Sequence, residues 1–152
     1  MKTFIVSSWV VFRLFTMVGD TTASSDMWLG ESVQTFMGRK YHCVVLKSDL
    51  KGDPKWDDEK DPPPLSASKA SRIAIKAVES QFGRDPSWTM NSGPGWGVSN
   101  VQLVGTADGD KNLWFYRVNL FLLMSGTGGR PEITLFLTLG GKVIPLVEMK
   151  TK

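Results

Sequence analysis

The sequence predicts an α+β domain in which one main helix packs on an antiparallel sheet of about four or five strands. Two observations predict this class. Residues 65–82 form the one long amphipathic segment, and after Trp96 apolar and polar residues alternate in runs that glycine-rich turns separate. Because the chain has 152 residues, it can bury one such core but not two.

The composition excludes several classes of protein. Hydrophobic residues make up 41% and charged residues 22% of the chain, an ordinary globular balance that excludes wholesale disorder. One cysteine excludes an internal disulfide, and one histidine excludes a multi-histidine metal centre. The net charge of +3 is smaller than a nucleic-acid binder usually carries. We therefore expect no metal, no cofactor and no nucleic-acid partner.

Residues 1–23 are predicted to be a cleaved signal peptide. Lys2 precedes an apolar run over residues 3–18, and the sequence Thr-Thr-Ala that ends at Ala23 fits the rule for cleavage between small residues. Arg13 interrupts the apolar run, which disfavours a membrane span. A first strand or a buried helix of a cytosolic protein is the alternative interpretation. The preferred prediction is a secreted or periplasmic chain with no stable membrane span after processing.

Residues 24–48 form an N-terminal segment with two interpretations. The spacing of its apolar residues allows a short helix, whereas residues 33–36 and 41–46 also allow a hairpin that turns at Gly38-Arg39. The alternation of side chains favours at least a strand over residues 41–46.

Residues 49–64 are predicted to be an acidic, proline-rich connector. Acidic residues outnumber lysines between 49 and 61, and three consecutive prolines follow, which forbid a helix there. The acidic residues do not match a calcium-binding loop, because no glycine lies where its sharp turn is needed. We expect a solvated segment that crosses the surface and leads to the helix.

Residues 65–149 are predicted to hold the helix and an antiparallel β-meander. Ser66 is a favourable N-cap, and Gly83 ends the helical pattern. Small alanines on the apolar face indicate a close approach to a sheet. Pro145 indicates an edge strand or the end of pairing. The expected strands cover residues 98–104, 113–123, 133–139 and 143–149.

Three short motifs resemble the PepSY-like group of small exported domains. They are Lys69-Ala70 with Ile73-Ala74 in the helix, Tyr116-Arg117-Val118 in a strand, and Gly141-Lys142-Val143 in the closing hairpin. The resemblance covers residues 64–147. It implies export to the periplasm or cell surface and a non-catalytic role in binding or restraining another protein, sometimes a peptidase. A cystatin-like helix wrapped by a curved sheet satisfies the same pattern.

Trp88 and Trp96 are the candidate binding residues. They bracket a proline- and glycine-rich loop over residues 85–97, which is longer than a simple connection needs. Two tryptophans on such a loop can form an exposed stacking platform for a sugar or a peptide. The alternative is that both fold back and plug the open end of the core.

No catalytic residue is predicted. A nucleophile needs a base beside it, and His42 is the only histidine. Its chain neighbour Cys43 points to the opposite face if residues 41–46 form a strand. We therefore expect an exported, non-enzymatic domain that binds an unknown protein or peptide. The alternative is a carbohydrate-binding module that holds a polysaccharide with Trp88 and Trp96.

Overall fold

The computed structural model describes residues 26–56, 60–83, 95–105, 113–123 and 130–150. The predicted signal peptide and Trp88 lie outside the described residues. Among the described residues, no helix is both long and apolar enough to cross a membrane. The elements, in chain order, are β1 (Trp28–Phe36), β2 (Arg39–Leu46), the 3-10 helix η1 (Lys47–Leu50), α1 (Ala67–Phe82), β3 (Trp96–Gly105), β4 (Trp114–Leu122), β5 (Glu132–Thr138) and β6 (Val147–Glu148).

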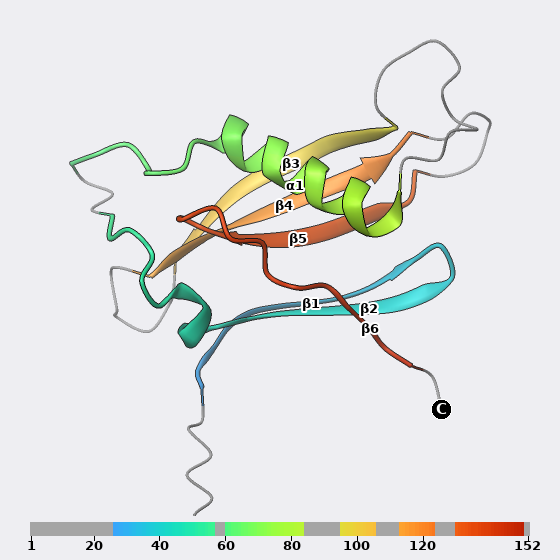
Figure 1. The fold of residues 1–152 in the computed structure, drawn as a ribbon, viewed down its shortest axis with the longest axis horizontal. Coiled ribbons are helices and arrows are strands. Elements are labelled where there is room, and N and C mark those ends of the chain that lie inside the picture. The colour runs from blue at the N-terminus through green and yellow to red at the C-terminus, as the bar shows by residue number, and fades with distance from the viewer. Residues whose placement is uncertain (1–25, 57–59, 84–94, 106–112, 124–129, 151–152) are drawn as a thin grey trace, which may run out of the picture.

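The strands form two three-stranded antiparallel sheets, in the orders β1-β2-β6 and β3-β4-β5 (Figure 1). The α+β class therefore holds in outline, but the prediction of one sheet of four or five strands under the helix is wrong. The C-terminal segment does not continue the meander beside β5. It leaves β5 after a single bridge between Leu137 and Val143 and pairs with β2 instead. Pro145 lies between the two pairings and has no N–H for a ladder hydrogen bond.

The β1–β2 hairpin settles the ambiguous N-terminal segment in favour of strands. Eight residue pairs align the two strands, from Trp28 opposite Leu46 to Phe36 opposite Arg39. The two residues of the turn, Met37 and Gly38, have φ angles of 50° and 77°. Two positive φ angles give the twist that a two-residue hairpin turn needs.

Helix α1 covers one face of the β3-β4-β5 sheet (Figure 1). The predicted helix is confirmed, with Ser66 Oγ accepting a hydrogen bond from the Lys69 N–H at 3.3 Å. Ala70, Ala74 and Val78 are fully buried on its inner face. Because two of these three side chains are a single methyl group, the helix axis approaches the sheet closely.

A strap of residues 142–146 joins the two sheets. It begins at the edge of β5, where the Thr138 N–H donates to the Lys142 carbonyl and the Ile144 N–H donates to the Phe136 carbonyl, both at 2.9 Å. Figure 1 shows the strap crossing in front of β1 and β2 before it reaches β6. Gln81 of α1 donates to the Leu146 carbonyl at 3.1 Å. The strap therefore contacts both the helix and the edge of β5.

Gln34 joins the sheets a second time, near the other end of β5. Its side-chain amide donates to the Thr134 carbonyl at 2.8 Å and accepts from the Thr134 N–H at 2.6 Å. One side chain thus makes the same pair of hydrogen bonds that a neighbouring strand makes in an antiparallel ladder. The edge of β5 is closed by Gln34 and by the strap.

The connector before the helix is held at several points. Asp49 accepts a hydrogen bond from Lys142 Nζ at 2.8 Å, and Asp53 accepts one from Thr138 Oγ1 at 2.9 Å. Leu65 is buried, and its carbonyl accepts from the Tyr116 hydroxyl at 2.5 Å. We expected a solvated segment that only crosses the surface. The structure shows that hydrogen bonds also attach it to β4, β5 and the strap.

Candidate functional site

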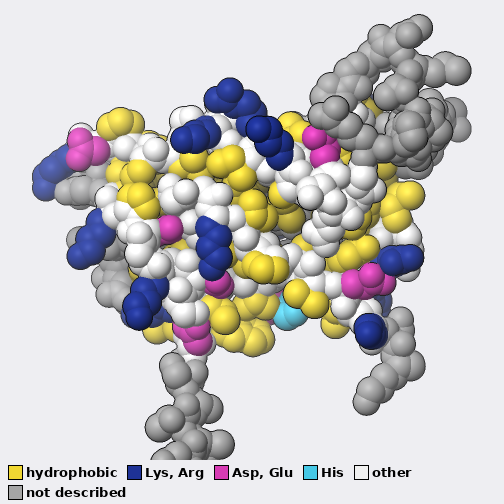
Figure 2. Space-filling view, viewed as in Figure 1, with side chains coloured by type: hydrophobic (Ala, Val, Ile, Leu, Met, Phe, Trp, Pro, Cys, Tyr) yellow, Lys and Arg dark blue, Asp and Glu magenta, His cyan; other side chains and the backbone are white. Residues whose placement is uncertain are grey.

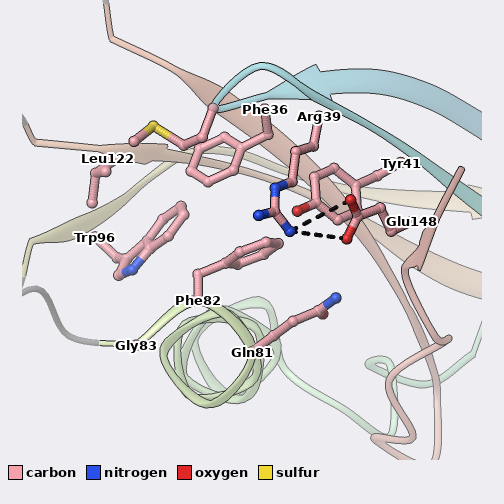
Figure 3. A pocket seen from close by; sticks show the side chains of 10 residues that line it. Phe36, Arg39, Tyr41, Gln81, Phe82, Gly83, Trp96, Leu122 and Glu148 are labelled. Carbon is pink, nitrogen blue, oxygen red and sulfur yellow. Dashed lines mark hydrogen bonds and ion pairs between the residues drawn. The ribbon is translucent and has the colours of Figure 1, made fainter. Parts of the chain in front are cut away.

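A pocket of about 460 Å³ opens between the tip of the β1–β2 hairpin and the last turn of α1 (Figure 3). Four parts of the fold meet there: the β1–β2 hairpin, the end of α1, strand β6, and the ends of β3 and β4 that lie nearest to the end of the helix. Residues that are far apart in the sequence therefore share one cavity. Its lining is Phe36, Met37, Arg39, Tyr41, Gln81, Phe82, Gly83, Trp96, Leu122 and Glu148.

Four aromatic rings form the apolar wall of this pocket. The Phe36 ring lies 5.1 Å from that of Phe82 and 5.4 Å from that of Trp96, between ring centroids. Tyr41 meets Phe82 edge to face at 5.4 Å. At these separations the rings pack directly against one another. They form a continuous wall with no gap that would enclose a ligand between two facing rings. Phe36, Tyr41 and Trp96 are buried in it, and half-buried Phe82 has the most accessible ring of the four.

Charged and polar groups occupy the rim. Arg39 Nη1 lies 3.2 Å from Glu148 Oε2, and both side chains are exposed (Figure 3). Exposed ion pairs contribute about 0–1 kcal/mol, so this pair opens at small cost. Once open, it presents a guanidinium and a carboxylate to a ligand. The arrangement fits a ligand with an apolar body and both hydrogen-bond donors and acceptors.

Met37 is the unusual residue of the rim. It is the only described non-glycine residue with a positive φ, at 50°, and its side chain is 61% exposed. Glycine and asparagine adopt this conformation much more readily than methionine does. An exposed, flexible thioether at a strained position costs stability, and such strain is concentrated at functional sites. Met37 is therefore a candidate for direct contact with a ligand.

The structure brings one of the two predicted binding residues into the pocket. Trp96 is only 4% exposed and contributes its ring to the aromatic wall, whereas Trp88 lies outside the described residues. A pairing of the two tryptophans therefore stays a prediction. Sequence reasoning did not single out Phe36, Tyr41 or Phe82. The signal for the two phenylalanines was their place at the ends of a strand and a helix, immediately before Met37-Gly38 and Gly83.

His42 and Cys43 lie on opposite faces of β2, as the alternation predicted. His42 Nε2 is 2.9 Å from Glu31 Oε1 on the outer face. Cys43 is buried on the inner face, where burial raises the pKa of its thiol to about 11. Its thiol is therefore almost entirely protonated at neutral pH and a poor nucleophile. Neither residue lines the aromatic pocket.

The described residues contain no group of three histidine, cysteine, aspartate or glutamate side chains that could hold a metal ion. Comparison of the chain with protein-family models, curated proteins and solved structures finds no match. The resemblance to the PepSY-like group therefore stays a prediction.

Proposed function

We propose that this protein is an exported, non-catalytic binding domain whose pocket holds an apolar side chain of a protein or peptide. The observation that carries the proposal is the aromatic wall beside the strained, exposed Met37. A large aliphatic or aromatic side chain would lie against half-buried Phe82 and exposed Met37, with the buried rings of Phe36 and Trp96 behind them. Neighbouring peptide groups would bond to Gln81 and to the opened pair of Arg39 and Glu148.

A peptide fits these features better than a polysaccharide does. Sugar platforms present the flat face of an exposed aromatic ring, but the Trp96 ring is covered by Phe36 and Phe82. Methionine adds a mobile apolar contact that adapts to different side chains and is common on surfaces that bind several peptides. This cavity, with apolar walls and a few polar groups at its rim, has the size of an ordinary ligand site.

The proposal is tested first with a minimal probe. N-acetyl-phenylalanine amide carries one aromatic side chain between two peptide groups and is titrated into the isotope-labelled protein. We expect millimolar binding, with the largest NMR shifts at Phe36, Phe82, Gly83 and Trp96. Shifts confined to other surfaces would contradict the pocket. Insoluble polysaccharides provide the opposing test, since their retention of the chain would favour the carbohydrate alternative.

A substitution of Met37 should change the stability of the protein and its affinity for the probe in opposite directions. Met37→Asn replaces a strained residue by one that suits its φ angle, so we expect the free energy of unfolding to rise by about 0.5 kcal/mol. The same change should weaken the probe at least threefold, because it removes an apolar contact at the rim. Val33→Asn is the matched control on the outer face of β1, where affinity for the probe should not change. Unchanged affinity in Met37→Asn would remove this residue from the site.

A further inference from the structure

The outer face of the β1-β2-β6 sheet carries exposed apolar side chains. Trp28 is 64% exposed, and Val33 and Val147 are each 59% exposed. The register places Val33, His42 and Val147 side by side on three adjacent strands, and directly opposed residues share a face. In Figure 2, hydrophobic side chains gather along the lower rim of the molecule, over β1 and β2, on either side of the cyan histidine.

The exposed face of the other sheet shows that this pattern is particular to one part of the fold. The face of β3 and β4 turned away from α1 presents Asn100, Gln102 and Arg117 to solvent. Isolated exposed apolar residues are normal, but apolar side chains gathered on one sheet face mark an interaction surface. The outer face of β1-β2-β6 therefore has the character of an interaction surface.

Opposite charges lie toward the two ends of this face, along the direction of the strands. Lys40 lies beside Thr35, near the hairpin tip, and Glu31 lies beside Val44, toward the other end. The level of Val33 and His42 lies midway between them. A two-fold axis across the strands at that level places Lys40 of one copy over the end that carries Glu31 in a second copy. The face is thus complementary to itself in an antiparallel, face-to-face arrangement.

We infer that this face joins two copies of the chain into a weak homodimer, with Val33 and Val147 at its centre and Lys40 opposite Glu31 of the second copy. Opposite charges at the two ends select this orientation over one that superimposes like charges. A lipid surface fits less well, because Glu31 lies within the face, and a carboxylate is repelled by anionic headgroups.

The size of the face limits its strength. β1 and β2, with nine and eight residues at about 3.4 Å each and strands about 4.8 Å apart, span roughly 30 Å by 10 Å, and the two residues of β6 add little. Two such faces bury on the order of 600 Å², which is below the usual range for stable complexes. We therefore expect a dimer that dissociates in the micromolar range, so that concentration is the variable to scan.

Sedimentation velocity over a concentration series tests the inference. The protein is used as isolated from its producing cells, with its N-terminus determined by mass spectrometry. The sedimentation coefficient should rise from that of a monomer to that of a dimer as concentration increases. Val33→Lys, which changes an exposed side chain, should shift the midpoint at least tenfold toward higher concentration. Leu123→Lys is the matched control at an exposed apolar position immediately after β4 and should leave the midpoint unchanged.

A charge exchange tests the orientation. Lys40→Glu alone should weaken the dimer, because it brings two carboxylates together at each end of the interface. The double variant Lys40→Glu with Glu31→Lys should recover most of the loss. Far-ultraviolet circular dichroism verifies that each variant is folded. A monomer at all concentrations would overturn the inference. So would a monomer that sediments with vesicles of phosphatidylcholine and phosphatidylglycerol and loses this property in Val33→Lys.

Discussion

The two sheets of this protein are covered in different ways. The β3-β4-β5 sheet buries one face under α1, and the other face is mainly polar where it meets solvent. The β1-β2-β6 sheet has no helix of its own: its inner face packs against the strap and against Phe115 of β4, and its outer face carries exposed apolar side chains. The chain therefore covers both apolar faces of one sheet, whereas the other sheet keeps an exposed apolar face for the second copy that we infer.

The position of the pocket follows from the same difference. Where the hairpin tip extends toward the end of α1, the aromatic rings of both parts meet and leave a cavity beside them. A single sheet fully covered by a helix offers no such place. The candidate site thus arises at the junction of the two sheets, and the strength of that junction is the quantity to test.

The largest effect is expected within the covered sheet. Leu137 is completely buried on the face that α1 covers, so Leu137→Ala should lower the free energy of unfolding by about 2–5 kcal/mol through lost apolar burial and a cavity. Val33→Ala on the exposed face should change it by less than about 0.5 kcal/mol. Urea denaturation at submicromolar concentration, where a weak dimer is dissociated, measures both. A comparable loss in Val33→Ala would show that its face is covered in the monomer.

Much of the covered sheet could be predicted from the sequence. The helix begins after Ser66 and ends before Gly83 as expected, and strands β3, β4 and β5 lie within two residues of the expected ranges. These elements have strong periodicity and clear terminal residues, which are local properties of the chain. Trp96 stands out in the sequence because it ends a conspicuous loop, but its burial fits the alternative in which it plugs the core and not an exposed platform.

The second sheet and the pocket could not be predicted in the same way. Alternation shows that a segment is a strand, but it does not show which edge the strand pairs with. The bonds that decide this join residues about a hundred positions apart, such as Gln34 with Thr134 and Cys43 with Ile144. The wall of the pocket likewise needs Phe36 to meet Phe82 and Trp96. No local pattern contains that information.

A smaller loss of stability is expected when the hydrogen bonds between the Gln34 side chain and the Thr134 backbone are removed. Gln34→Ala leaves the N–H and carbonyl of Thr134 without their partner, so the free energy of unfolding should fall by about 1–3 kcal/mol. The amide proton of Thr134 should also exchange faster with solvent. Gln102→Ala is the matched control at an exposed glutamine on β3 and should have little effect. Unchanged protection of Thr134 would mean that the link does not contribute to the junction.

The smallest effect concerns the ion pair between η1 and the strap. Burial by itself would raise the pKa of Asp49, but hydrogen bonds from Lys142 Nζ and the Leu46 N–H, with the charge of Lys142, bring this pKa below its ordinary value of 3.8. A carboxyl whose pKa is lower in the folded state contributes stability above its unfolded pKa. That contribution is lost as the pH falls through the folded pKa.

Lys142→Met should therefore lower the free energy of unfolding by about 0.5–1 kcal/mol at neutral pH, a small value because the Lys142 side chain is largely exposed. The difference from wild type should begin to shrink as the pH falls past 3.8 and should vanish well below it. Lys76→Met, at an exposed lysine on α1, should show no such pH dependence. If the difference caused by Lys142→Met persists in acid, the lysine stabilises the strap through packing of its methylene groups, and the two sheets are joined here without electrostatics.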